Sequence, residues 1–221
     1  MSEEDDVVEF SDELDRQELL RRLPEITRIN DKELQDEVID TFLNHAPDYF
    51  WKIPASSSGY FHQTDAVGNL GLLLHTKRTF VALERLGETY LHQNRINEKE
   101  MDYARASILL HDLFKQGLPE DRQEKSEGDR GTVSNHDRIA KNYLEEHTEL
   151  PNPVLELIDS HNGGWNEGKK PENDLEDLHH SADMQGSDRN QIAKVYKPCE
   201  EIEEVFNKKI FFHEGIEANF D

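Results

Sequence analysis

Histidines and aspartates recur through the middle of the chain, most of them within or just after an apolar run. The series comprises His75 in GLLLHT, His111 and Asp112 in ILLHDLFK, His136 in SNHDRIA, His161 in IDSHNGG and Asp183 in HHSADM. Neutral imidazoles and carboxylates together suit first-row divalent metals such as Mn, Fe, Co, Ni or Zn better than Ca. Any one of these residues alone is more often structural, but the whole ordered series is difficult to obtain by chance. We therefore predict a site for one or two divalent ions, with Mg²⁺ as a further candidate.

The adjacent pair His111-Asp112 is the most informative part of this series. It directly follows the apolar run Ile108, Leu109 and Leu110. Neighbouring side chains on a helix point about 100° apart, so both reach one ion only near the edge of a buried face. An ionisable pair in such a place is costly to bury unless it is compensated, and a cation would compensate it.

Apolar spacing and capping residues predict helices for most of the chain. The expected helices are one capped by Ser11 that ends near Leu23, one that starts at Asp31, and others at about 70–91, 98–114, 134–147, 153–161 and 173–187. Glycine, proline and polar residues predict irregular segments at 46–69, 116–132 and 162–172. Two short runs, 192–196 and 209–212, have strand-like composition and would pair as a hairpin.

The sequence thus predicts an all-α fold, a helical bundle with irregular loops. We expect an acidic tail and N-terminal helices at 1–59, a helical domain at 60–190, and an extension with the small hairpin at 191–221. Five further histidines are expected to be surface or capping residues, namely His45, His92, His147, His179 and His213.

Acidic residues outnumber basic ones, 48 to 25, which gives a formal net charge of -23. Such a domain repels itself at ordinary ionic strength, and concentrated salt screens that repulsion. We interpret the charge as adaptation to a salt-rich cytoplasm, as in a halophilic archaeon or its virus; the alternative is an ordinary protein with a basic partner. The acidic start of the chain, the absence of a long apolar stretch and the single Cys199 favour a cytoplasmic protein without a membrane span.

The metal-ligating series resembles the HD-domain superfamily of metal-dependent phosphohydrolases, which are all-helical. The match covers residues 60–190 and includes the core signature His75, His111-Asp112 and Asp183. His136 and His161 match two further histidines of members that hold two metals.

Two narrower resemblances concern branches of the superfamily. Lys115 gives the pattern HDxxK of the HD-GYP cyclic-dinucleotide phosphodiesterases and of several nuclease-like branches. The element GNLGLLLHT is similar to GGLLEHT of bacterial 3′-to-5′ exoribonucleases with an HD domain, and the segment from 158 to 184 has the spacing of their SHHG and LHxxD elements. Asn69 and Asn162 depart from those elements, whereas His180 fits the second one.

The resemblance implies roles for these residues. His75, His111, Asp112 and Asp183 would hold the first metal, and Asp112 would bridge to a second that His136 and His161 complete. Two such metals can share a hydroxide that attacks phosphorus in line, while they stabilise the developing charge. Lys115 would contact a phosphate oxygen or the leaving group; the alternative for Lys115 is an ordinary cation near a helix C-terminus.

Three further residues are candidates for substrate contacts. Arg138 and Lys169 could neutralise phosphate, although most cations in so acidic a chain pair with surface carboxylates. Trp165 could stack on a base, and the alternative for it is packing of its own loop.

The pattern leaves several functions open. The first is a phosphohydrolase or phosphodiesterase acting on a nucleotide, cyclic nucleotide or oligonucleotide, with a phosphorylated small molecule or single-stranded nucleic acid as its partner. The second is a 3′-to-5′ exonuclease on single-stranded nucleic acid. The others are a non-catalytic, metal-stabilised scaffold and an oxygenase with an iron pair. The terminal additions would cover the cleft or form a homodimer contact.

Overall fold

The computed structural model describes residues 14–56, 66, 69–119, 131–163 and 169–187, and within them the fold is all-α, as predicted. The α-helices are α1 (Arg16–Arg22), α2 (Lys32–His45), α3 (Gly71–His92), α4 (Glu98–Leu110), α6 (His136–His147), α7 (Asn152–Ser160) and α8 (Asp174–Ser187). Two short 3-10 helices accompany them, η1 (Pro24–Arg28) and η2 (Asp48–Trp51). The expected hairpin of 192–196 and 209–212 lies outside the described residues.

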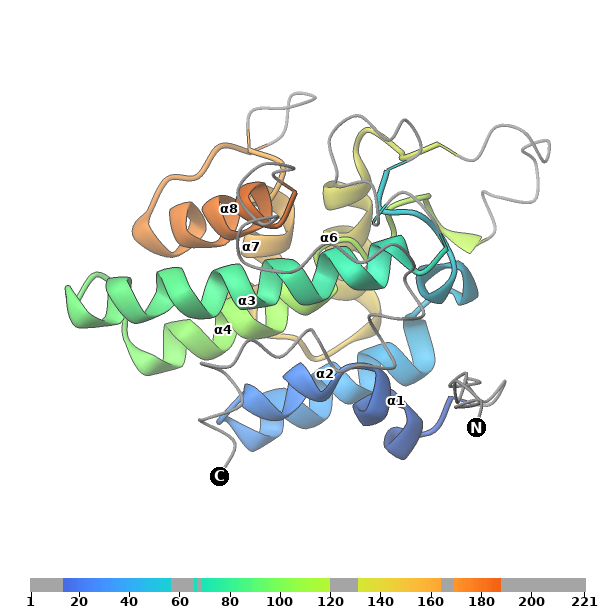
Figure 1. Ribbon diagram of the computed structural model, residues 1–221, viewed down its shortest axis with the longest axis horizontal. Coiled ribbons are helices and arrows are strands. Elements are labelled where there is room, and N and C mark those ends of the chain that lie inside the picture. The colour runs from blue at the N-terminus through green and yellow to red at the C-terminus, as the bar shows by residue number, and fades with distance from the viewer. Residues whose placement is uncertain (1–13, 57–65, 67–68, 120–130, 164–168, 188–221) are drawn as a thin grey trace, which may run out of the picture.

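Helix α3 is the central element of the bundle. It runs side by side with α4, and α8 packs along it from another side, while α1 and α2 lie beyond α4 (Figure 1). From Gly71 to Glu84 every side of α3 is buried. Gly186 of α8 makes this packing close, because a Cβ there would lie 2.2 Å from the methyl carbon of Thr79. His75 is therefore held on a helix with neighbours all round.

The N-terminal helices share the core of the rest of the molecule. Leu19 of α1 and Phe42 of α2 are fully buried in one hydrophobic cluster that also includes residues of α3, α4, α6, α7 and α8. Lys77 of α3 is buried as well, and it pairs with Glu25 of η1 at 2.9 and 3.0 Å. These contacts fix α3 against the N-terminal segment. The division of the chain into domains stays a prediction.

Capping residues explain where several helices begin. Asp31 caps α2 by accepting hydrogen bonds from the backbone of Glu33 and Leu34, as expected. Asn97 and Glu100 form a reciprocal capping box at the start of α4. The expected start of the first helix at Ser11 is wrong. That helix begins at Arg16, because the carboxylate of Asp15 caps it.

The end of α4 also differs from the expectation. The sequence predicted a helix to about residue 114, but α4 ends at Leu110 and residues 111–116 form successive tight turns. Lys115 N donates to Asp112 O at 3.0 Å, and Gly117, with φ +81°, closes the last turn on Phe114 O. The pair His111-Asp112 consequently lies at a helix C-terminus, where the chain changes direction.

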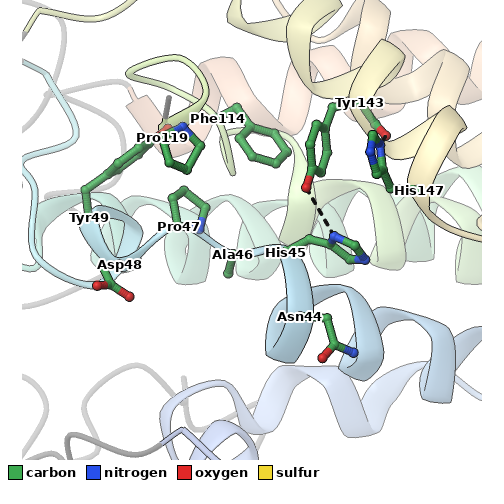
Figure 2. Close-up of a pocket in the computed structure, with 10 residues that line it drawn as sticks. All are labelled: Asn44, His45, Ala46, Pro47, Asp48, Tyr49, Phe114, Pro119, Tyr143 and His147. Carbon is green, nitrogen blue, oxygen red and sulfur yellow. Dashed lines mark hydrogen bonds between the residues drawn. The ribbon is translucent and has the colours of Figure 1, made fainter. Parts of the chain in front are cut away.

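A groove of about 630 Å³ lies behind these turns, between the C-terminal ends of α2 and α6 (Figure 2). Tyr143 stacks on His147 at 4.1 Å between ring centroids and contacts Phe114 at 4.8 Å. The Tyr49 hydroxyl donates to Gly117 O at 2.7 Å and so braces the turns.

Among the described residues, no helix combines the length and apolar composition that a membrane span needs.

Candidate metal centre

Two groups of three ligand-bearing side chains meet at the centre of the bundle. The first group draws His75 from α3, His111 from the end of α4 and Asp183 from α8. His75 Nε2 lies 3.2 Å from His111 Nε2 and 3.1 Å from Asp183 Oδ1, and His111 Nε2 lies 3.5 Å from the same carboxylate oxygen. Both imidazoles are buried, and the Asp183 side chain is 13% exposed.

The second group consists of Asp112, His136 and His161. His136 opens α6, and His161 ends α7. Their Nε2 atoms lie 3.2 Å apart, at 3.0 and 3.5 Å from Asp112 Oδ1. All three side chains are buried. The helices α6 and α7 pack together, so the two histidines approach from neighbouring elements.

Asp112 faces both groups with its two carboxylate oxygens. Oδ1 points to the second group, whereas Oδ2 lies 3.4 Å from the Nε2 atoms of both His75 and His111. Since one carboxylate serves the two groups, they form a single centre. The structure thus brings together all six residues of the sequence series.

Backbone carbonyls fix the orientation of three imidazoles. The Nδ1 atoms of His111, His136 and His161 each lie 2.7 Å from the carbonyl oxygen three residues earlier. His111 and His161 follow the last residues of their helices, where carbonyls have no helical partner and are free to accept. With the proton on Nδ1, neutral imidazole presents the lone pair of Nε2 to the centre, which is the tautomer that binds a metal.

The centre also has the electrostatics of a cation site. Burial opposes charge on every group, but Lys115 and His111 hold the pKa of Asp112 well below its usual range. Burial likewise opposes ionisation of Asp183, and hydrogen bonds from His111 and His75 lower its pKa. Against the cost of burial, these two carboxylates raise the pKa of His111 to about 10. Without a metal, a proton on His111 supplies part of the positive charge that the carboxylates require.

The donor set fits a divalent metal. Ligand atoms that share one first-row ion at about 2.1 Å lie about 3.0–3.4 Å apart, and the spacings within the two groups are 3.0–3.5 Å. Asp112 Oδ1 is buried and accepts no hydrogen bond within the described structure. A buried carboxylate oxygen in that state is costly unless a cation faces it.

Lys115 lies at the edge of this centre. Its ammonium group is 2.5 Å from Asp112 Oδ2, and its side chain is 10% exposed. The tight turns after α4 bring it back over the carboxylate three residues earlier. Lys115 thus faces the same centre as the ligand groups, and its contact with substrate stays a prediction.

The other candidates for substrate contacts differ in their surroundings. Arg138 is 58% exposed on α6, with Nε 3.5 Å from Asp159 Oδ1. Lys169 pairs with Glu156 at 2.7 Å and Glu176 at 2.9 Å, so two carboxylates already compensate its charge. Trp165 lies outside the described residues.

Two histidines of α8 were not singled out as functional from the sequence. His179 was expected at the surface, but it is fully buried, 2.9 Å from Ser107 Oγ, with its ring 6.2 Å from that of His111. His180 Nδ1 donates to the backbone oxygen of His161 at 2.6 Å. Both precede Asp183 by one helical turn. This spacing of three and four residues places them on the same face of α8 as Asp183, and it is the feature of the sequence that could have indicated their position near the centre.

The fold and the site together agree with a comparison against protein families. The HD domain family matches residues 72–196, which is more than half of the chain, and the chain belongs to that family. HD domains are generally metal-dependent hydrolases. No curated protein and no solved structure matched the chain.

Proposed function

We propose that this protein is a metal-dependent phosphohydrolase that cleaves a phosphoester of a nucleotide, a cyclic nucleotide or a short oligonucleotide. The observation that carries the proposal is the position of Asp112. One carboxylate oxygen of Asp112 faces each ligand group, and Oδ1 accepts no hydrogen bond from the residues that the structure describes. A single structural ion would not require a carboxylate directed at two separate sets of imidazoles.

The proposed ligands of one ion are the first group, His75, His111 and Asp183, together with Asp112 through Oδ2. The proposed ligands of the other ion are the second group, Asp112, His136 and His161. Imidazole with carboxylate suits Mn, Fe, Co, Ni or Zn, with Mg²⁺ as a further candidate. When bound, such ions supply Lewis acidity and lower the pKa of water so that hydroxide is available near neutral pH.

The protein's own residues prepare the site for this chemistry. The carbonyls of Ile108, Val133 and Ile158 hold three imidazoles in one orientation, so no reorganisation is needed when a charged substrate arrives. Lys115 brings one positive charge to the edge of the centre, where a phosphate oxygen or a leaving group can share it with Asp112.

The surroundings favour a small phosphoester over a long polynucleotide. A track for single-stranded nucleic acid needs several exposed cations and aromatic faces in sequence. Three cations among the described residues are candidates for contact with substrate. Lys115 contacts Asp112, and two glutamates compensate the charge of Lys169. Arg138 is exposed. The likeness of GNLGLLLHT to an exoribonuclease element supports the exonuclease as the second candidate.

The test is an assay of substrate classes in molar KCl with Mn²⁺, because the net charge of -23 suggests a protein adapted to salt. The panel contains nucleoside mono- and triphosphates, cyclic mono- and dinucleotides, and single-stranded RNA and DNA. Asp112→Ala removes the bridging carboxylate, and Asp36→Ala removes an exposed carboxylate of α2 as the matched control.

We expect the parent and Asp36→Ala to release product from one class, and Asp112→Ala to release none. Stepwise shortening of RNA or DNA as the single activity would select the exonuclease. If the parent holds Mn²⁺ yet releases nothing from any class, the phosphohydrolase proposal is wrong, and a scaffold or an air-dependent iron oxygenase takes its place.

A further inference from the structure

Asn162 is the one residue of the 160–163 turn whose side chain reaches the second ligand group without belonging to it. It directly follows His161, and its Nδ2 lies 3.3 Å from His136 Nε2. This distance falls within the 3.0–3.5 Å spacing of the three members of that group. The amide end of Asn162 is therefore as far from His136 Nε2 as one ligand of an ion is from another.

The chemistry of His136 decides which amide atom faces the group. His136 Nδ1 is bonded to Val133 O, so Nε2 is an acceptor when the ring is neutral. An amide N–H can donate to that lone pair only while no cation uses it. Once an ion takes the lone pair, a half turn of the amide presents Oδ1 in place of Nδ2 at almost no steric cost. Amide oxygens are ordinary ligands of hard divalent cations.

The backbone around Asn162 is held from both sides. Gly163 N donates to Ser160 O at 2.9 Å, and His180 of α8 donates to His161 O at 2.6 Å. Gly163 has φ +59°, and a Cβ there would come within 2.8 Å of the His180 ring. The turn is thus packed directly against α8, and the Asn162 side chain leaves it in a defined direction.

We infer that Asn162 is a fourth ligand of the second metal group, through Oδ1. The inference rests on the metal centre of the proposed function. It makes the two groups unequal in charge, because the first has two carboxylates, Asp183 and Asp112, whereas the second shares Asp112 and adds a neutral amide. The first group should fill first, and the second should hold a weaker, exchangeable ion.

The test is a titration of the metal-free protein with Mn²⁺, followed by calorimetry and by electron paramagnetic resonance, which reports a coupled ion pair when both groups are full. Three variants are compared with the parent. Asn162→Leu keeps the volume and removes the ligand, Asn162→Asp keeps an oxygen and adds charge, and Asn44→Leu alters an exposed asparagine of α2 that bonds Asp40. Circular dichroism of each metal-free variant checks the fold.

We expect two unequal dissociation constants for the parent and for Asn44→Leu. Asn162→Leu should weaken the second ion by roughly tenfold to a hundredfold and abolish the coupled-pair signal at moderate Mn²⁺. Asn162→Asp should retain the signal and bind the second ion at least as tightly as the parent.

An unchanged second ion in Asn162→Leu would overturn the inference. So would an equal loss in Asn162→Leu and Asn162→Asp, because then the NH₂ group, and not the oxygen, acts at the site. Both results leave the phosphohydrolase proposal intact if the parent still holds two ions. A parent that binds no Mn²⁺ would remove the metal centre itself.

Discussion

Binding of the first metal ion should displace one proton from His111. Burial opposes a charge on this imidazole, but Asp112 and Asp183 outweigh burial and raise its pKa to about 10. Nδ1 is bonded to Ile108 O, so the displaceable proton is on Nε2, which faces Asp183 at 3.5 Å. The ion and this proton compete for the same lone pair.

The free energy needed to remove this proton from His111 follows from the difference between its pKa and the working pH. At pH 8, about two units below the pKa, removal of the proton costs about 2.7 kcal/mol. The apparent affinity for Mn²⁺ should therefore rise about tenfold per pH unit from pH 7 to 9. Calorimetry in two buffers of different ionisation enthalpy should report release of about one proton for the first ion at pH 8.

The same linkage gives a sign for stability. The folded pKa lies above the ordinary 6.5, so the proton stabilises the metal-free fold fully below about pH 6.5, and this contribution is lost as the pH rises toward 10. Metal-loaded protein should not lose stability over this range. His92→Gln, at an exposed site at the end of α3, is the control and should leave the proton release unchanged. A release near zero with an affinity independent of pH would refute the reasoning.

Three other predictions concern the supports of the site. Glu25→Gln leaves Lys77 buried beside a neutral amide and should lower the free energy of unfolding in urea by about 3–5 kcal/mol. A loss below about 1 kcal/mol would contradict the importance of this ion pair. Gly163→Ala should cost about 1–2 kcal/mol because of φ +59° and contact with His180; urea unfolding of the metal-free protein measures it, and an unchanged midpoint would show that the turn adapts. Lys115→Met should reduce kcat about a hundredfold, whereas Lys115→Arg should retain part of it; equal kcat in parent and Met variant would exclude Lys115 from the chemistry.

The sequence predicted the all-α class and most helix boundaries because these depend on local patterns. Asp31 before Leu34 and Phe42 marks the start and the buried face of α2, whatever the rest of the chain does. The six residues of the metal series were likewise visible as residue types in a fixed order. The division of these six residues between two ions came from the family resemblance, because spacing along the chain does not show which side chains meet.

Local patterns failed where tertiary contacts compete with them. Apolar residues recur after α4 at Leu113 and Phe114, so the sequence predicted a helix that was too long. In the fold, Tyr49 and the backbone of Val133 bond the 115–117 segment and favour tight turns there. His179 has no local feature that distinguishes it from its neighbour His180, and it is buried because α8 packs against other helices, with Ser107 of α4 beside its ring.

The sequence by itself determined the all-α class, the approximate positions of most helices and the types of side chain available for a metal site. Only the tertiary structure decided that Asp112 faces two ligand groups, that Lys115 turns back onto it, and that Asn162 reaches the second group. The physical reason is distance along the chain. Helix formation depends on residues within a few positions of one another, whereas convergence of α3, α4, α6, α7 and α8 on one point depends on how their buried faces pack.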